Sequence, residues 1–455
     1  MNSEPGSHEL IARVLECART AGATATDAVL VENESMETRI RGDEVDRVTQ
    51  ARERCLGIRA LSGGNGAGLR TAITSTSDLS IEAVEKLVAE TVDLARQTAP
   101  DPAAGLPEED PATEVPDLGL LDPADRNVAV EARIEDARRA ERDARESDVR
   151  IDNSEGSEAG SHFAKVHYGN SVGFSGSYES AFHSLYSQPI ARENGSMQRD
   201  SWFTIGRRLA DLEDAAEVGR RAAQRALGRL GARRVPTCEV PVIFDAVTAA
   251  SLVGQLASCL SGYSVYRKMT FLESRMGDAV APEFVTIVDD GRLQGGLGSK
   301  PFDGEGLATR RNILVDRGRL SSWLLDSYSG RKLDLPSTGN AARSAGSAPG
   351  VSATNLWIEP GEARLEELIQ DTPRGLLVTE LIGMGFNPVT GDYSRGAAGF
   401  WIEAGEIAYP VEEITVAGNL GDMLMNIDAV GSELLWRSRI AAPPLRIARM
   451  TVAGE

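Results

Sequence analysis

The chain has 455 residues, enough for two or three domains, and its 41% hydrophobic and 25% charged residues are typical of a soluble globular protein. Its formal net charge of −20 repels polyphosphates, so nucleic acid is not an expected ligand. The first ten residues lack the basic and apolar regions of a signal peptide, and no apolar run approaches the length of a membrane span, so the expected location is the cytoplasm. The cysteines form no C-x-x-C pair, which argues against a zinc knuckle, a redox motif and a disulfide framework: Cys17, Cys55, Cys238 and Cys259.

Residues 1–98 are predicted to form an N-terminal α+β domain. Apolar residues at helical spacing predict helices over 8–22 and 81–97. Between them, four segments rich in β-branched and apolar residues predict a strand meander: DAVLVENES, METRIRGDE, RCLGIRALSGG and GAGLRTAITST. Helices lying on a strand meander give an α/β-type unit.

A linker and a central region follow. Residues 99–125 hold six prolines and eight carboxylates but no Lys or Arg, a composition that resists both helix and strand. The region 126–235 then begins with a helix over 128–145, continues with long half-exposed strands over 149–205, and ends with an amphipathic helix over 210–231.

The C-terminal region, 236–455, is predicted to be mainly antiparallel β with a few helices. Short apolar strands alternate with glycine-rich turns, and two hairpins are expected to turn at Asp316–Gly318 and at Ala404–Gly405. The chain as a whole is therefore predicted to be α+β.

One helix in this region, AASLVGQLASCLSG over 249–262, presents a small, polar and uncharged face. Ala249 and Val253 lie on its apolar stripe, whereas Ser251 and Gln255 lie on another stripe. Asp245 precedes the helix where its side chain can cap the free N–H groups. Cys259 lies within the helix with no activating neighbour, so it is not expected to be catalytic.

Histidine is scarce, which limits hydrolytic and metal chemistry. The chain has only His8, His162, His167 and His183. His162 and His167 are separated by an odd number of positions, so they face opposite sides of a regular strand and could share a metal only at a bulge. Asp289 and Asp290 follow a strand and could hold a hard cation, but no calcium-loop spacing follows them. The sequence therefore predicts no metal site in this chain.

Two glycine-rich segments are not expected to bind phosphate. SGGNGAG, over 62–68, lies between two predicted strands and is interpreted as a hairpin loop, because a dinucleotide loop would enter a helix. The segment that begins at Gly295 contains Lys300 but lacks the G-K-[ST] ending of a phosphate loop.

The segment TGDYSRGAAGFW, over 390–401, is open to two interpretations. It combines three glycines with a polar cluster just before an apolar strand: Asp392, Tyr393, Ser394 and Arg395. The structural interpretation is a tight loop held by an ion pair between Asp392 and Arg395. The functional interpretation is a backbone-lined edge where an extended peptide or a small ligand binds.

Long stretches of the chain resemble the TldD/PmbA family, specifically its PmbA (TldE) branch. The resemblance is dense from about Glu239 to Gly454 and looser over the N-terminal half. It rests on SVYRKMTFL, KPFDGEGLATRRNILVDRG, LLDSYSGRKLDLPSTGNA, LLVTELIGMGFNPVTGDYSRGAAGFWIEAGEIAYPVEEITVAGNL and MTVAG.

The resemblance implies a cytosolic, zinc-dependent protease of two related subunits, in which the TldD-type chain carries the active site on an H-E-x-x-x-H helix and a C-terminal Cys. In this sequence the three helix positions match Ala250, Ser251 and Gln255, and the Cys position matches Val430. These residues cannot supply the zinc ligands or the general base. Where PmbA-type chains read STGHAGG, this chain reads STGNAARSA, with Asn340 in place of His.

The resemblance therefore predicts a non-catalytic subunit that pairs with a TldD-type metalloprotease and helps to enclose unfolded peptide substrates, such as leader peptides. It implies no cofactor in this chain and zinc in the partner. The candidate peptide groove comprises Asn340, Asp392, Tyr393, Ser394 and Arg395. The candidate partner surfaces are the strands over 149–205 and the helix over 245–260.

Two alternatives remain open: a self-standing homodimeric scaffold that captures peptides, and a peptidase whose unusual site is built around Asp392, Tyr393 and Arg395. A role as a gyrase modulator fits poorly with the acidic charge.

Overall fold

A single large sheet holds the strands of the first 206 residues. The computed structural model describes residues 6–64 and 66–454, so Met1–Pro5 of the amino-terminal stretch and Asn65 of the glycine-rich segment lie outside the described residues. The strand order is β3-β2-β1-β4-β5-β6, and β7 also pairs with β5. The strands are β1 (Ala25–Arg41), β2 (Glu44–Gly63), β3 (Leu69–Thr76), β4 (Ile151–Asn170), β5 (Ser175–Glu193), β6 (Ser196–Arg199) and β7 (Trp202–Gly206).

This sheet joins the predicted N-terminal and central regions, because β1 pairs with β4 from Asp27–Asn170 to Ile40–Ser157. The sequence predicts two strands within 27–44, whereas the structure has one strand over most of this span. β1 is paired on both sides, to β2 and to β4, so its ladder continues through the polar residues 32–35 that interrupt the apolar pattern. The prediction of two strands there is wrong.

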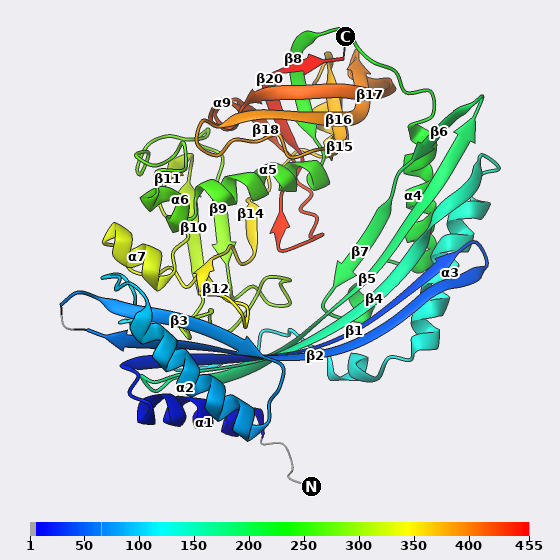
Figure 1. Ribbon diagram of the computed structural model, residues 1–455. Helices are drawn as coiled ribbons and strands as arrows, with labels where there is room; N and C mark the ends of the chain where they lie inside the picture. The colour runs from blue at the N-terminus through cyan, green and yellow to red at the C-terminus, as the bar shows by residue number, and fades with distance from the viewer. Residues whose placement is uncertain (1–5, 65, 455) are drawn as a thin grey trace.

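Four helices cover one face of the sheet (Figure 1). They are α1 (Ser7–Thr20), α2 (Ile81–Gln97), α3 (Val130–Glu146) and α4 (Ala215–Gly228). Leu30 of β1 packs with α1 and α2, and Ile40 packs with α3 and α4. Since side chains alternate along a strand, these two even-numbered residues lie on one face, and odd-numbered Val29 points to the other face, where it packs against Phe302 of the C-terminal region.

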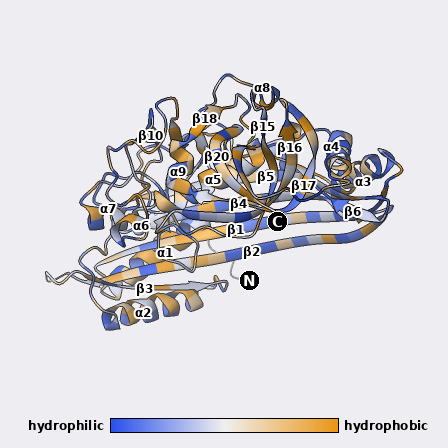
Figure 2. Cartoon of the chain, turned by 90° about the horizontal axis from the view of Figure 1, so that it is seen from above, coloured by the Kyte–Doolittle hydropathy of each residue, from blue (hydrophilic) through white to orange (hydrophobic). Residues whose placement is uncertain are grey.

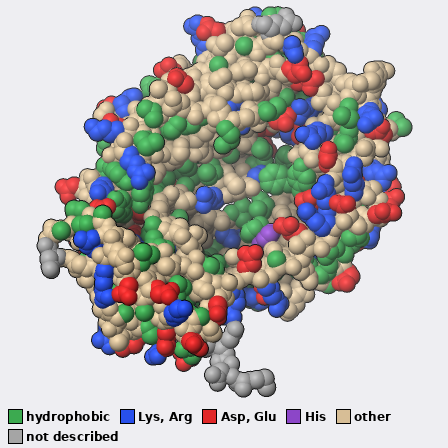
Figure 3. Space-filling view, viewed as in Figure 1, with side chains coloured by type: hydrophobic (Ala, Val, Ile, Leu, Met, Phe, Trp, Pro, Cys, Tyr) green, Lys and Arg blue, Asp and Glu red, His purple; other side chains and the backbone are tan. Residues whose placement is uncertain are grey.

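The exposure of β2 changes along its length. Its residues next to β3 are hydrophobic and buried, whereas those from Glu44 to Glu53 are mostly hydrophilic and exposed (Figure 2). The long strands thus leave the inner face of the sheet open in their middle, and Figure 3 shows the molecule hollowed between this sheet and the C-terminal region.

The C-terminal region contains two larger sheets, of order β17-β16-β15-β8-β20-β18 and β11-β10-β9-β14-β19. Most pairs are antiparallel, as predicted, with β15–β8 and β14–β19 parallel. The elements are β8 (Cys238–Phe244), α5 (Ala246–Cys259), α6 (Gly262–Tyr266), β9 (Ile287–Asp290), β10 (Arg311–Asp316), β11 (Arg319–Leu320), α7 (Ser327–Leu333), β12 (Ala341–Ala342), β13 (Gly350–Val351), β14 (Leu356–Ile358), α8 (Leu365–Gln370), β15 (Arg374–Ile382), β16 (Asp392–Glu403), β17 (Glu406–Asn419), α9 (Leu420–Met425), β18 (Ile427–Val430), β19 (Ile440–Ala441) and β20 (Leu445–Ala453).

Both predicted hairpins form. Arg317 and Gly318 join β10 to β11, and Ala404 and Gly405 join β16 to β17. All four residues have positive φ, which two-residue turns between twisted strands require. The α+β prediction for the chain is confirmed. No helix among residues 6–64 and 66–454 is long and apolar enough to cross a membrane.

The segment 99–125 lies along the C-terminal region as a strap. Its regular structure is limited to a bridge at Asp101 and a short 3-10 turn over Pro123–Asn127. Arg331 of α7 donates to the carbonyl oxygens of Ala103 and Leu106, at 2.9 and 3.2 Å. The strap therefore connects the first sheet to the C-terminal core through backbone contacts.

Candidate functional site

A cavity of about 280 Å³ lies where the first sheet and α4 meet the C-terminal region. Its lining comes from β7, α4, α5, β15, β16 and adjoining loops, and it contains neither histidine nor cysteine: Asp200, Ser201, Trp202, Phe203, Arg225, Val247, Thr248, Ser251, Thr379, Glu380, Leu381, Arg395 and Arg437.

The start of α5 is fixed against β15. Asp245 caps the helix by accepting a hydrogen bond from the Thr248 backbone N–H at 2.8 Å, and the Thr248 hydroxyl lies 3.1 Å from the carbonyl oxygen of Val378. Asp245 is buried, which raises the pKa of its carboxyl group. These contacts place Ser251, one turn further along, at the cavity.

Arg395 brings a positive charge to this face of α5. Its Nη1 donates to Ser251 Oγ at 2.8 Å, and its Nη2 donates to the carbonyl oxygen of Leu381 at 3.3 Å. The structure thus brings together two of the residues singled out from the sequence, Ser251 and Arg395, from segments far apart in the chain.

Two more arginines surround Trp202 at the same cavity. The guanidinium carbons of Arg437 and Arg225 lie 4.7 and 5.7 Å from the centre of the indole. Glu213 accepts a hydrogen bond from the indole N–H at 3.0 Å and also pairs with Arg437. Guanidinium groups donate to carbonyl and carboxylate oxygens, so this arrangement can bind a peptide backbone or an acidic group.

The polar cluster over 392–395 is a strand, not a loop. β16 begins at Asp392, so Tyr393 and Arg395 share one face whereas Asp392 and Ser394 are exposed on the other. Asp392 accepts a hydrogen bond from Thr390 at 2.7 Å, and Arg395 donates to Ser251, so the expected ion pair between Asp392 and Arg395 is wrong. Burial raises the pKa of Tyr393 to about 12.

Asn340 and Val430 lie away from this cavity. Asn340 is fully buried and donates to Asp289 Oδ2 at 2.7 Å, within a network that also includes Thr354. Burial raises the pKa of Asp289 to about 6. Val430 ends β18 and belongs to the largest hydrophobic cluster of the C-terminal region.

The polar face of α5 does not fit zinc. Ala250 offers no donor atom, Ser251 accepts a hydrogen bond from a guanidinium, and a cation at this place would be repelled by Arg395. Gln255 is half-buried and carries no charge. Cys259 is buried, which raises the pKa of its thiol to about 11 and leaves little thiolate at neutral pH.

The histidines of the first sheet are separated as their spacing predicts. His162 lies on the inner face, 3.5 Å from Glu37, whereas His167 pairs with Leu30 on the helix-covered face. His183 is buried beside Ser161 and Asp125. Within the described part of the chain, no group of three or more His, Cys, Asp or Glu side chains is arranged to hold a metal ion.

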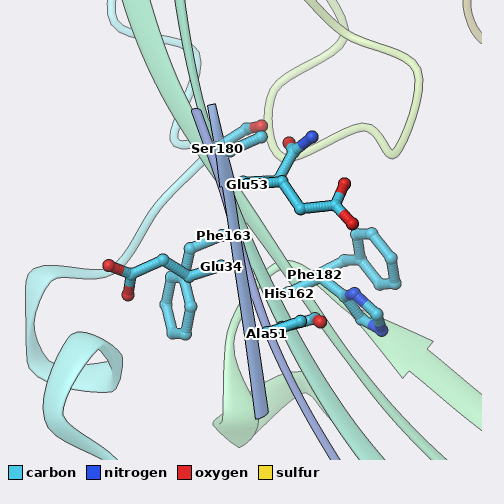
Figure 4. A pocket seen from close by; sticks show the side chains of 10 residues that line it. Glu34, Ala51, Glu53, His162, Phe163, Ser180 and Phe182 are labelled. Atoms are coloured by element: carbon cyan, nitrogen blue, oxygen red, sulfur yellow. The ribbon is translucent and has the colours of Figure 1, made fainter. Parts of the chain in front are cut away.

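A second cavity, of about 310 Å³, lies on the sheet (Figure 4). Small side chains such as Ser35, Ala51 and Ala164 line it, and His162 stacks on Phe182 with ring centres 4.4 Å apart. The side chains around this cavity lie on both faces of the sheet. In Figure 4, Glu34 and Phe163 project to one side and Glu53 and Phe182 to the other.

Trp202, Arg225 and Arg437 all line the first cavity, but no motif in the sequence points to them. They come from β7, α4 and a loop near the C-terminus, which only the tertiary structure brings together. A tryptophan in a predicted half-exposed strand indicates a candidate contact surface. By itself it does not show which residues lie beside it or what binds there.

Comparison with known proteins agrees with this architecture. The three domains of the PmbA/TldA metallopeptidase family match residues 26–95, 123–230 and 237–454. The Escherichia coli O157:H7 protein named metalloprotease PmbA is 40% identical over 98% of this chain and 96% of its own length. The Haemophilus influenzae metalloprotease PmbA homolog is 37% identical over the same shares of each chain.

Solved structures share the fold. A crystal structure from Bacteroides thetaiotaomicron, of a proposed modulator of DNA gyrase, has a TM-score of 0.89 and 27% identity over 98% of each chain. The TldE structure from Thermococcus kodakarensis has a TM-score of 0.87 and 24% identity, covering 98% of this chain and all of the other. From its domains and its relatives, the chain is a PmbA-type member of the PmbA/TldD metalloprotease family.

Proposed function

We propose that this chain is the non-catalytic subunit of a two-chain zinc protease, in which a TldD-type partner holds the metal and cleaves unfolded peptides. The observation that carries the proposal is the contact between Arg395 and Ser251 on α5. Ser251 stands where the resemblance places the catalytic Glu of the partner, and Arg395 adds a positive charge there. This face therefore lines the space that the peptide occupies and supplies no metal ligand.

The surroundings support a role in peptide binding. Three arginines and Trp202 line the cavity at α5. The guanidinium groups can donate hydrogen bonds to the backbone carbonyls and acidic side chains of a peptide. The inner face of the long sheet adds the cavity at His162. All four cysteines are unpaired thiols, which favours the reducing cytoplasm as the location. Leader peptides and unfolded proteins are substrates that such a protease meets there.

The first experiment measures zinc and turnover together. The purified chain should contain less than about one-tenth zinc per chain after mild dialysis, because specific zinc sites survive such handling. A TldD-type chain with the H-E-x-x-x-H motif, handled identically, is the control and should retain about one zinc. An unfolded peptide should be cleaved only when both chains are present.

Three results would overturn the proposal. Stoichiometric zinc in this chain would indicate a site of its own, to be sought first at His162, His167 and His183. Turnover by the chain alone, lost in Arg395→Ala without unfolding, would favour the peptidase with an unusual site. Peptide binding with no response to any TldD-type partner would favour the homodimeric scaffold.

A further inference from the structure

A third cavity, of about 280 Å³, lies at the junction of β2, the strap, α6 and α7. It is separate from the cavity at α5, since the two share no lining residue. Its polar lining includes Arg59, Asp101, Tyr263, Arg267, Glu305 and Tyr328. Parts of the chain as far apart as Arg59 and Pro349 therefore meet around one partly open space.

Glu305 is the buried carboxylate of this cavity, with 1% of its surface exposed. Its Oε2 accepts a hydrogen bond from the Ser327 backbone N–H at 2.9 Å. No other hydrogen bond to this carboxylate is found among residues 6–64 and 66–454, and Glu305 lines the cavity. A donor on a ligand in the cavity can therefore add a hydrogen bond to this carboxylate.

The nearby charges act on Glu305 in both directions. Arg59 and Arg267 also line the cavity, and Arg267 lies over the rings of Tyr263 and Tyr266. Arg59 faces Glu305, but the Arg59 guanidinium is bound to Asp27, which also pairs with Arg343. Asp303 and Asp326 add negative charge nearby. Burial, followed by the repulsion of Asp303, raises the pKa of Glu305 to about 7.

The tyrosines on the wall offer acceptors rather than donors. The Tyr263 hydroxyl donates to Asp326 Oδ2 at 3.2 Å, and the Tyr328 hydroxyl donates to Asp101 Oδ2 at 2.7 Å. Their single protons are thus committed, and their oxygens can only accept further hydrogen bonds. A carboxylate oxygen also only accepts, so a ligand that reaches Glu305 needs hydrogen-bond donors.

We propose that this cavity binds a primary ammonium group, carried by a peptide N-terminus or by a lysine side chain, with Glu305 as its counter-ion. An ammonium group has three donors and no acceptor, which matches this lining. An anion would be repelled by Glu305. The peptide source of the amine rests on the function proposed above, whereas binding of the ammonium group does not.

Titration calorimetry on the purified chain tests the site without any partner or turnover, so its failure is separable from failure of the protease proposal. The probes are Nα-acetyl-lysine amide, which has only the side-chain ammonium, and alanyl-alanine amide, which has only the terminal one. N-acetyl-alanine amide is the uncharged control. At least one charged probe should bind, and the uncharged control should not. The probe that binds more tightly shows whether the ammonium group comes from a lysine side chain or from a peptide N-terminus.

Two further readouts follow from Glu305. Glu305→Gln should weaken binding of the charged probe roughly tenfold or more, because it removes a charge-assisted hydrogen bond. Glu283→Gln, whose side chain is 81% exposed and lines none of the three cavities, makes the same chemical change and should leave affinity unaltered. For the lysine probe, which stays charged, affinity of the unmodified chain should rise roughly tenfold from pH 6 to pH 8 as Glu305 ionises.

Equal binding by Glu305→Gln and the unmodified chain would overturn the proposal, as would binding no weaker for the acetylated control. The proposal would also be overturned if neither charged probe bound at about 10 mM, because most specific sites have dissociation constants well below this concentration. If Glu305→Gln does not fold, the pH dependence and the uncharged control decide the matter in the unmodified chain.

Discussion

Burial lowers the pKa values of three histidines of the first sheet. His183 is fully buried, with Nδ1 2.9 Å from Ser161 Oγ and Nε2 3.5 Å from Asp125. Burial lowers the pKa of His183 more than Asp125 raises it. Burial also lowers the pKa values of His162 and His167. Protonation therefore opposes the folded state at each of these positions.

The free energy of unfolding should consequently decrease as the pH falls below about 6.5, where the unfolded chain binds protons that folded His183 resists, by up to about 1.4 kcal/mol per pH unit. Burial of Glu305 acts in the opposite direction, since its raised pKa makes stability fall as the pH rises towards 7. Because the two effects oppose each other, the variant is compared with the unmodified chain. Between pH 7.5 and pH 5.5, the free energy of unfolding measured in urea should fall less for His183→Gln than for the unmodified chain. Exposed His8→Gln is the control, and equal losses in His183→Gln and the unmodified chain would contradict the prediction.

At the scale of elements, β2 is in close contact with a loop of the C-terminal region. A Cβ atom placed on Gly57 would lie 1.9 Å from the carbonyl oxygen of Ala345. Two residues before Ala345, Arg343 reaches Asp27 on β1, with its side chain buried. Glycine at position 57 thus lets the loop lie directly on the strand.

Gly57→Ala should lower the free energy of unfolding by about 1–3 kcal/mol, because the added methyl group must displace backbone on one side or the other. Chemical denaturation monitored by circular dichroism measures the change. Gly350→Ala, where a Cβ would meet nothing within 4 Å, is the matched control and should change stability by less than about 0.5 kcal/mol. A similar loss in both variants would show that the close contact is not the cause.

At the scale of the molecule, the strap over 99–125 joins the first sheet to the C-terminal core. Arg331 binds two of its carbonyl oxygens, and Glu109 accepts a hydrogen bond from the Ser337 backbone N–H at 2.9 Å. Leu118 also binds the opposite backbone, by accepting from the Gly295 N–H at 2.8 Å. These contacts replace the regular structure that the prolines prevent.

Arg331→Ala should make the strap more sensitive to proteolysis between residues 107 and 114. Loss of about 1.4 kcal/mol of local contacts raises the open population, and hence the initial rate of cleavage, roughly tenfold. Mass spectrometry of short digests with a non-specific protease measures the rate. Arg317→Ala, whose side chain is 74% exposed, serves as the control. Unchanged cleavage within the strap would mean that its other contacts suffice to hold it.

The sequence by itself determined the elements whose cause is local. Helices over 7–20, 81–97 and 246–259 follow from apolar spacing and, for α5, from the Asp245 cap. The two hairpins follow from glycine at turns that need positive φ. The family followed from long motifs of the C-terminal half, and the unsuitability of Ala250, Ser251 and Gln255 for zinc followed from their chemistry.

Only the tertiary structure decided which distant residues meet. Strand alternation separated Asp392 and Ser394 from Arg395, and burial drew Asn340 into a network with Asp289, away from the cavity at α5. Pairing on both sides joined two expected strands into β1. The contact of Ser251 with Arg395 and the place of Glu305 at the third cavity depend on packing between segments far apart in the chain, for which local periodicity carries no signal.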